Sequence, residues 1–81
     1  MAIRSDTNNR NLPDTIVEMK LEGEISGYDY SVGIPDLDTE YVEQELEGLE
    51  FEVSETEVRH REGVNILYRE EDQERIYDLI P

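Results

Sequence analysis

The side chains with chemical reactivity in this chain are mostly carboxylates. Of its 81 residues, 22 are Asp or Glu and seven are Lys or Arg, so the formal net charge is −15. Carboxylates can act as general acids and bases, bind hard metal ions, or bind the guanidinium groups of a partner. The residues that surround them decide between these three kinds of chemistry.

Acid–base catalysis is the first of the three, and the sequence argues against it. No motif singles out a catalytic pair among the carboxylates, and no nucleophile with an adjacent base is recognisable. Each glycine has a turn or strand explanation, so the sequence indicates no phosphate-binding loop. A domain of this size also has little room for a pocket. We therefore predict that the protein is not an enzyme.

Metal binding is the second possibility. Asp36, Asp38, Glu40 and Glu47 have a spacing similar to that of the ligands in a calcium loop, but the sixth position, which needs glycine, is Tyr41. Helix capping explains the same acids more simply, because an apolar stripe runs through the segment. The chain has no cysteine, which excludes disulfides, zinc thiolate sites and thiol catalysis. We predict no metal site and no cofactor.

The few basic groups include the only histidine, His60, between Arg59 and Arg61. Such a histidine can carry a proton or act as a pH switch, but two neighbouring cations disfavour its protonation, so a structural role is favoured. With Arg69, these arginines form the one basic spot. The net charge repels nucleic acid, so we expect the arginines to pair with nearby carboxylates instead.

The elements that position these groups belong to one small domain, since a second core does not fit in this length. Residues 1–13 are polar and aperiodic and are predicted to be a flexible N-terminal arm, followed by a single domain over residues 14–81. No apolar run has membrane-spanning length, and the start lacks the apolar core of a signal peptide. We expect a cytoplasmic protein that does not bind membranes.

Alternating apolar residues predict a first β-hairpin. A two-residue turn at Ser26–Gly27 would place Met19 opposite Ile34 and Tyr30 over Gly23, with Gly27 at positive φ. One face of this hairpin collects its apolar residues, namely Val17, Met19, Leu21, Ile25, Tyr28, Tyr30, Val32 and Ile34. This face is predicted to be buried.

The second half follows the same plan. A helix is predicted from Asp36 or Asp38 to Gly48, and a shorter one after Glu70. Between them lies a second hairpin with a break near Ser54–Glu55, a three-residue loop at 61–63, and pairs His60–Val64, Val58–Ile66 and Thr56–Tyr68. The predicted fold is α+β: a four-stranded antiparallel sheet with two helices on one face, in the order ββαββα.

These registers place many acids on the uncovered sheet face, namely Glu18, Glu22, Glu24, Asp29, Glu50, Glu52 and Glu57, with Glu40, Glu43 and Glu47 on the outer side of the first helix. Such a face offers ordered carboxylates to a basic protein surface. In charge and size the chain resembles small phage-type inhibitors that occupy the nucleic-acid-binding surface of a nuclease or transcription factor. The expected function is therefore non-enzymatic binding of a basic partner, without direct nucleic-acid contact.

Two alternatives stay open. Scarce lysine beside many carboxylates resembles the composition of halophile proteins, in which acidity serves solubility in high salt, although the single Ala and seven Ile do not fit that composition. A sheet edge left open would also support a homodimer by strand addition.

Overall fold

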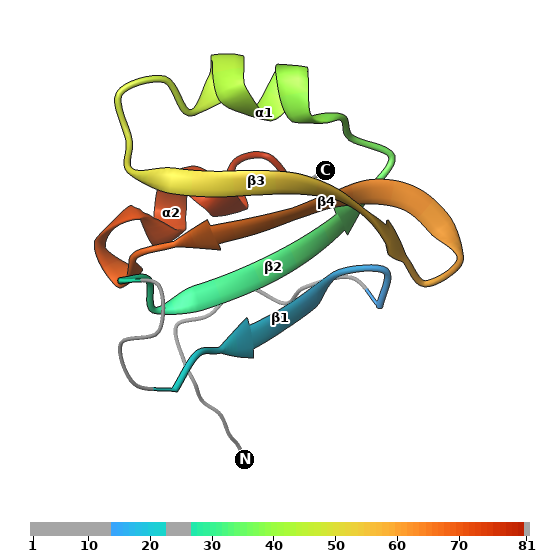
Figure 1. Cartoon of the computed structure of the whole chain (residues 1–81), viewed down its shortest axis with the longest axis horizontal. Coiled ribbons are helices and arrows are strands. Elements are labelled where there is room, and N and C mark those ends of the chain that lie inside the picture. Colours follow the sequence, from blue (N-terminus) through green and yellow to red (C-terminus); the bar gives the residue numbers. More distant parts are fainter. Residues whose placement is uncertain (1–13, 23–26, 81) are drawn as a thin grey trace.

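A computed structural model describes residues 14–22 and 27–80 of the chain, and shows a four-stranded antiparallel sheet with helices packed against it. The elements in chain order are β1 (Val17–Lys20), β2 (Tyr30–Pro35), α1 (Thr39–Glu45), β3 (Phe51–Val58), β4 (Arg61–Tyr68), a 3₁₀ turn η1 (Glu70–Asp72) and α2 (Gln73–Tyr77). The sheet order is β1-β2-β4-β3, and α2 lies behind β3 and β4 in the view of Figure 1. The predicted α+β class and the order ββαββα are confirmed.

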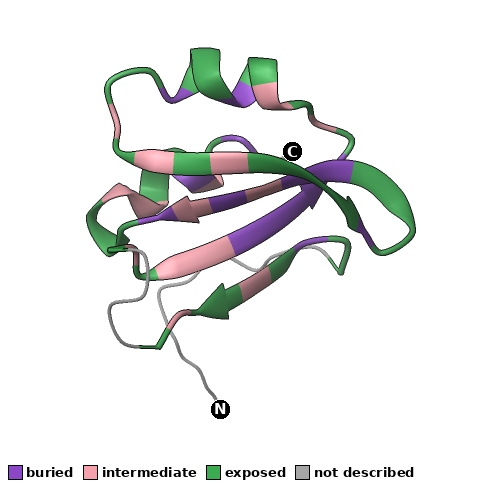
Figure 2. Cartoon of the chain, in the orientation of Figure 1, coloured by how far each residue is buried: buried purple, intermediate pink, exposed green. Residues whose placement is uncertain are grey.

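The two inner strands carry most of the core. Alternate residues of β2 and β4 are buried against residues of both helices, and these strands show the most burial in the sheet (Figure 2). The buried cluster comprises Ile16, Val32, Ile34, Val42, Leu46, Val64, Ile66, Tyr68, Ile76 and Leu79. Since α1 and α2 contribute to one cluster on one side of the sheet, both helices cover the same face, as predicted.

The two ends of the first helical segment have the residues that the sequence predicts for them. The Asp38 carboxylate accepts a hydrogen bond from the backbone N–H of Tyr41 at 2.8 Å, which caps α1. Gly48 has φ of 95°, a conformation that glycine adopts without strain, and it ends the segment after α1. The helix itself is shorter than the predicted range because its last turn opens at Leu46.

The first outer strand pairs in a different register from the predicted one. Met19 lies opposite Ser31 and Glu18 opposite Val32, so the strand is shifted by three residues and its two faces are exchanged. The predicted pairs of Met19 with Ile34 and of Gly23 with Tyr30 are wrong. The Leu21 N–H donates to the Asp29 carbonyl at 2.8 Å, which closes a longer connection than a two-residue turn.

Part of that predicted turn, residues 23–26, lies outside the described residues, as does the predicted arm at 1–13. Gly27 itself has the expected positive φ, at 77°. The exchange of faces has a physical cause in the strand pattern: a shift by an odd number of residues moves every side chain of a strand to the opposite face. Glu18 therefore faces the helices, while Val17 and Met19 face away from them.

The second hairpin also differs from the prediction. Arg59 and His60, with φ of 50° and 73°, form a two-residue turn of the primed kind, and β3 pairs with β4 without a break from Phe51 to Val58. The predicted loop at 61–63, the break near Ser54 and the pair of Val58 with Ile66 are wrong. Val58 lies opposite Arg61 instead.

Gly63 has a packing role rather than the predicted turn role. A Cβ atom at this position would lie 2.3 Å from the carbonyl oxygen of Ile34 on β2. The glycine is therefore needed for the close approach of β4 to β2. A sequence reading that assigns every glycine to a turn cannot detect such a contact, because it depends on a strand far away in the chain.

Candidate functional site

The predicted acidic sheet face is not present, because both outer strands pair in other registers. Of the acids expected there, Glu52 remains at a strand position on the uncovered face, whereas Glu18 and Glu57 occupy positions on the side of the helices. Glu22 and Asp29 are exposed in the connection between β1 and β2, and Glu24 lies outside the described residues. The prediction of a continuous carboxylate grid on this face is wrong.

The acids on and after the first helix lie where they were expected. Glu40, Glu43 and Glu47 are all exposed, and none of the three belongs to the core. Glu50, just before β3, is exposed as well and forms an ion pair with Arg69 at 3.1 Å. The predicted second acidic patch on α1 is thus available to solvent.

A groove that the sequence did not predict lies between the start of α1 and the β3–β4 hairpin. It has a volume of about 360 Å³ and is lined by Leu37, Asp38, Glu55, Thr56, Glu57, Glu62 and Gly63. Four of these residues are acids, and none is basic. We call this set of residues the acidic groove.

The two-residue turn of the hairpin produces this accumulation of charge. It places Glu57 at the strand position directly opposite Glu62, and Glu55 two pairs further along the same strand. Like charges directly opposite each other destabilise a strand pair. The signal was present in the sequence as three Glu close to the hairpin, but it becomes visible only with the correct turn.

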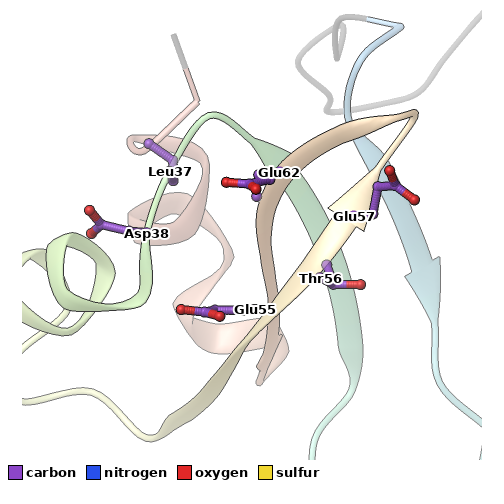
Figure 3. Close-up of a pocket in the computed structure, with 7 residues that line it drawn as sticks. Leu37, Asp38, Glu55, Thr56, Glu57 and Glu62 are labelled. Carbon is purple, nitrogen blue, oxygen red and sulfur yellow. The ribbon is translucent and has the colours of Figure 1, made fainter.

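The side chains of the acidic groove do not all point into it. In Figure 3, Glu55 and Glu62 point toward the segment that carries Leu37 and Asp38, and Glu57 points away on the other side of β3. Asp38 turns toward α1, where it caps the helix. Glu55 and Glu62 are therefore the carboxylates that a bound group would meet.

Within residues 14–22 and 27–80, neither Glu55 nor Glu62 has an ion pair or a side-chain hydrogen bond. The same part of the chain contains no group of three or more His, Cys, Asp or Glu placed to hold a metal ion. The arrangement is suited to a long cationic side chain, because separated carboxylates along an open groove can each accept a hydrogen bond from it.

A second constellation joins one carboxylate to tyrosines. Glu18 accepts hydrogen bonds from the hydroxyls of Tyr68 and Tyr77, the latter at 2.8 and 3.0 Å from its two oxygens. Gln73 donates to the Tyr77 hydroxyl oxygen at 3.2 Å, and the Tyr30 ring stacks on Tyr68 with centroids 5.6 Å apart. We call these five residues the tyrosine cluster.

The tyrosine cluster has a structural character. Burial, and then the hydrogen bond to Glu18, raise the pKa of Tyr68 and of Tyr77 well above the ordinary value, so both hydroxyls remain protonated donors. Tyr68 is fully buried. Because Glu18 belongs to β1 and Tyr77 to α2, the hydrogen bonds connect an edge strand to the last helix. The cluster explains why β1 turns its glutamate inward.

Two arginines of the described part of the chain pair with carboxylates. Arg61 contacts the Asp36 carboxylate at 2.9 Å, and Arg69 contacts Glu50, so the predicted intramolecular pairing is confirmed for these two arginines. His60 is exposed in the hairpin turn, and its predicted position opposite Val64 is wrong. Exposed ion pairs of this kind contribute little to stability.

No helix in the described part of the chain has the length and apolar character needed to cross a membrane. Comparisons with protein-family models, with curated proteins and with solved structures find nothing that matches this chain.

Proposed function

We propose that this protein is a small non-enzymatic binding protein whose acidic surface engages a basic segment of a partner protein. The observation that carries the proposal is the acidic groove, in which Glu55 and Glu62 lie together without a cation in the described part of the chain. Glu57 lies at the strand position opposite Glu62 and adds to the negative charge around the groove, although its side chain points away from it. The groove is therefore a defined place on the surface at which these carboxylates can bind a cationic side chain.

The chemistry of the groove favours arginine. A guanidinium group binds carboxylates in a planar, bidentate manner, and its long apolar stem can lie along Leu37 at the groove wall. The exposed acids Glu40, Glu43 and Glu47 follow the groove along the chain and extend the negative surface. Glu22, Asp29, Glu50 and Glu52 lie on other exposed parts and would act at longer range.

The partner class follows from the charge. A net charge of −15 repels nucleic acid and anionic membranes, and attracts proteins with basic surfaces. Nucleic-acid-binding proteins, such as nucleases and transcription factors, have surfaces of this type. The proposed protein would therefore compete with DNA or RNA for such a surface without contacting nucleic acid itself.

A matched pair of double variants tests the proposal. Glu55→Gln with Glu62→Gln neutralises the groove, and Glu71→Gln with Glu74→Gln makes the same charge change at exposed positions around the start of α2. Both variants and the wild type are immobilised in dilute buffer, and the proteins that each retains from a lysate are identified after a salt wash. Binding of an arginine-rich peptide is measured in parallel by calorimetry.

We expect the groove variant to bind the peptide about tenfold more weakly, since one charge-assisted hydrogen bond is worth about 1.5–3 kcal/mol, and the control variant to change by less than about twofold. Equal losses in both variants would contradict a specific groove. A fold that forms only at molar salt would instead support the alternative, in which the acidity serves solubility.

A further inference from the structure

The face of the sheet that the helices leave uncovered differs from the rest of the surface in charge. Among its strand positions there is one carboxylate, Glu52, and one guanidinium, Arg61, which is paired with Asp36. The other positions are held by uncharged residues, namely Val17, Met19, Ser31, Gly33, Pro35, Ser54, Thr56, Val58, Gly63, Asn65 and Leu67. We call this the open face.

The open face also carries exposed apolar side chains. In the described part of the chain, three large hydrophobic residues are classed as exposed, and two of them lie here: Met19 at 58% and Val17 at 36%. The sequence alternation would have buried both. They are exposed because β1 places Glu18 on the helix side, toward the tyrosines. The two apolar side chains therefore project into solvent from the open face.

A hollow of about 170 Å³ lies directly beside this projection. It is lined by Val17, Met19, Ser31, Gly33, Thr56, Glu57, Val58, Arg59 and Asn65, so one carboxylate and one guanidinium of the hairpin stand at its edge. Gly33 allows Val58 to pack closely over the backbone of β2, because a Cβ atom there would lie 3.2 Å from a methyl group of Val58. Val58 itself is buried, although it belongs to the open side of β3. A projecting methionine and a hollow that has both apolar and polar residues in its wall are thus neighbours on one face.

We infer that the open face is the contact surface of a homodimer, in which Met19 of each copy enters the hollow beside Gly33 of the other. A two-fold dimer requires one patch to be complementary to itself, and a projection next to a hollow meets that requirement. Methionine suits the role because its flexible side chain adapts to irregular gaps.

The distribution of charge favours a second copy over a basic partner on this face. Two chains of net charge −15 repel each other, and the open face is where they can meet with the fewest carboxylates brought together. A basic protein is attracted to the acidic side instead. The small core of an 81-residue chain also gains stability from association, as small domains commonly do.

This dimer has a salt dependence opposite to that of the proposed partner binding. Repulsion between the copies is screened as the Debye length falls from ~10 Å at 0.1 M to ~3 Å at 1 M salt. Dimerisation should therefore strengthen with salt, whereas binding of an arginine-rich segment should weaken. The two properties depend on different side chains, Glu55 and Glu62 for the partner and Met19 for the second copy, and can fail independently.

Sedimentation of the full chain in dilute buffer and in ~1 M NaCl, over a range of protein concentrations, tests the inference. We expect a mass of 9.5 kDa in dilute buffer and, at high salt, a rise toward twice that value with concentration. Met19→Glu should weaken the dimer at least about tenfold, because it removes the projecting apolar side chain and brings a carboxylate beside Glu57 of the other copy. Tyr41→Glu makes the same change at a residue that is 44% exposed on α1 and should leave the dimer unchanged.

A second variant, Gly33→Ala, adds a methyl group at the hollow and should also weaken the dimer. Its fold is checked by circular dichroism, because the added methyl group lies close to a methyl group of Val58. Monomers at every salt and protein concentration would overturn the inference. A dimer that Met19→Glu leaves intact would overturn it too, because the contact would then lie elsewhere, for example at a sheet edge.

Discussion

Two carboxylate environments in this molecule show how the same functional group serves different purposes. Glu18 accepts hydrogen bonds from two tyrosine hydroxyls and connects β1 to α2. The side-chain carboxylates of Glu55 and Glu62 have no hydrogen-bond or ionic partner in the described part of the chain. A carboxylate that is fully engaged inside a protein stabilises the fold, whereas one without a partner is available for binding.

The largest expected effect comes from removing the engaged carboxylate. Glu18→Ala leaves two tyrosine hydroxyls without their acceptor, and we expect a loss of about 2–3 kcal/mol in the free energy of unfolding, measured with urea. Glu55→Ala serves as the control in the other environment and should change stability by less than about 0.5 kcal/mol. Similar losses in the two variants would remove the distinction between the sites.

Alkaline pH should act on the tyrosine cluster alone. Because the pKa of Tyr68 is raised in the folded protein, its stabilising effect is complete below the ordinary tyrosine pKa of about 10 and is lost as the pH rises above that value. Unfolding measured by urea should become easier by up to about 1.4 kcal/mol per pH unit for this group. Tyr68→Phe should make the dependence shallower, and an unchanged slope would contradict the assignment.

A smaller loss is expected for the hydroxyl on α2. Tyr77→Phe removes one donor to Glu18 and keeps the ring, so we expect a decrease of about 1 kcal/mol in the free energy of unfolding. In a double-mutant cycle with Glu18→Ala, the two changes should not be additive, because they break the same contact. Additive losses would show that Tyr77 acts through packing only.

The smallest expected effect has the opposite sign. Glu57→Gln removes one negative charge from the hairpin, at the strand position opposite Glu62, and should raise the free energy of unfolding by about 0.2–1 kcal/mol in dilute buffer. The gain should shrink at high salt, since exposed charges are then screened. A loss of stability in this variant would mean that the groove acids are engaged rather than free.

The inner and outer strands differ in how far their sequence predicts them. Val32, Ile34, Val64, Ile66 and Tyr68 alternate in β2 and β4, and all of them are buried, with Val32 and Ile34 on the face that the sequence predicts. These strands are paired on both sides and covered by both helices, so any slip would expose the core. In β1, the alternation of Val17 and Met19 with Glu18 predicts the wrong buried face.

Local composition therefore determined the fold class, the order of elements, the cap at Asp38 and the buried face of the inner strands. Only the tertiary structure decided the face of β1 and that of the second half of β3, whereas the start of β3, with Phe51 and Val53 toward the core, followed the sequence pattern. An outer strand is held on one side only, and its alternation is compatible with either face until long-range contacts select a register. The contact between Glu18 and Tyr68, which are 50 residues apart, makes that selection for β1, and the turn at Arg59–His60 makes it for β3. For this reason the net charge could be read from the sequence, but the acidic groove and the uncharged open face could not.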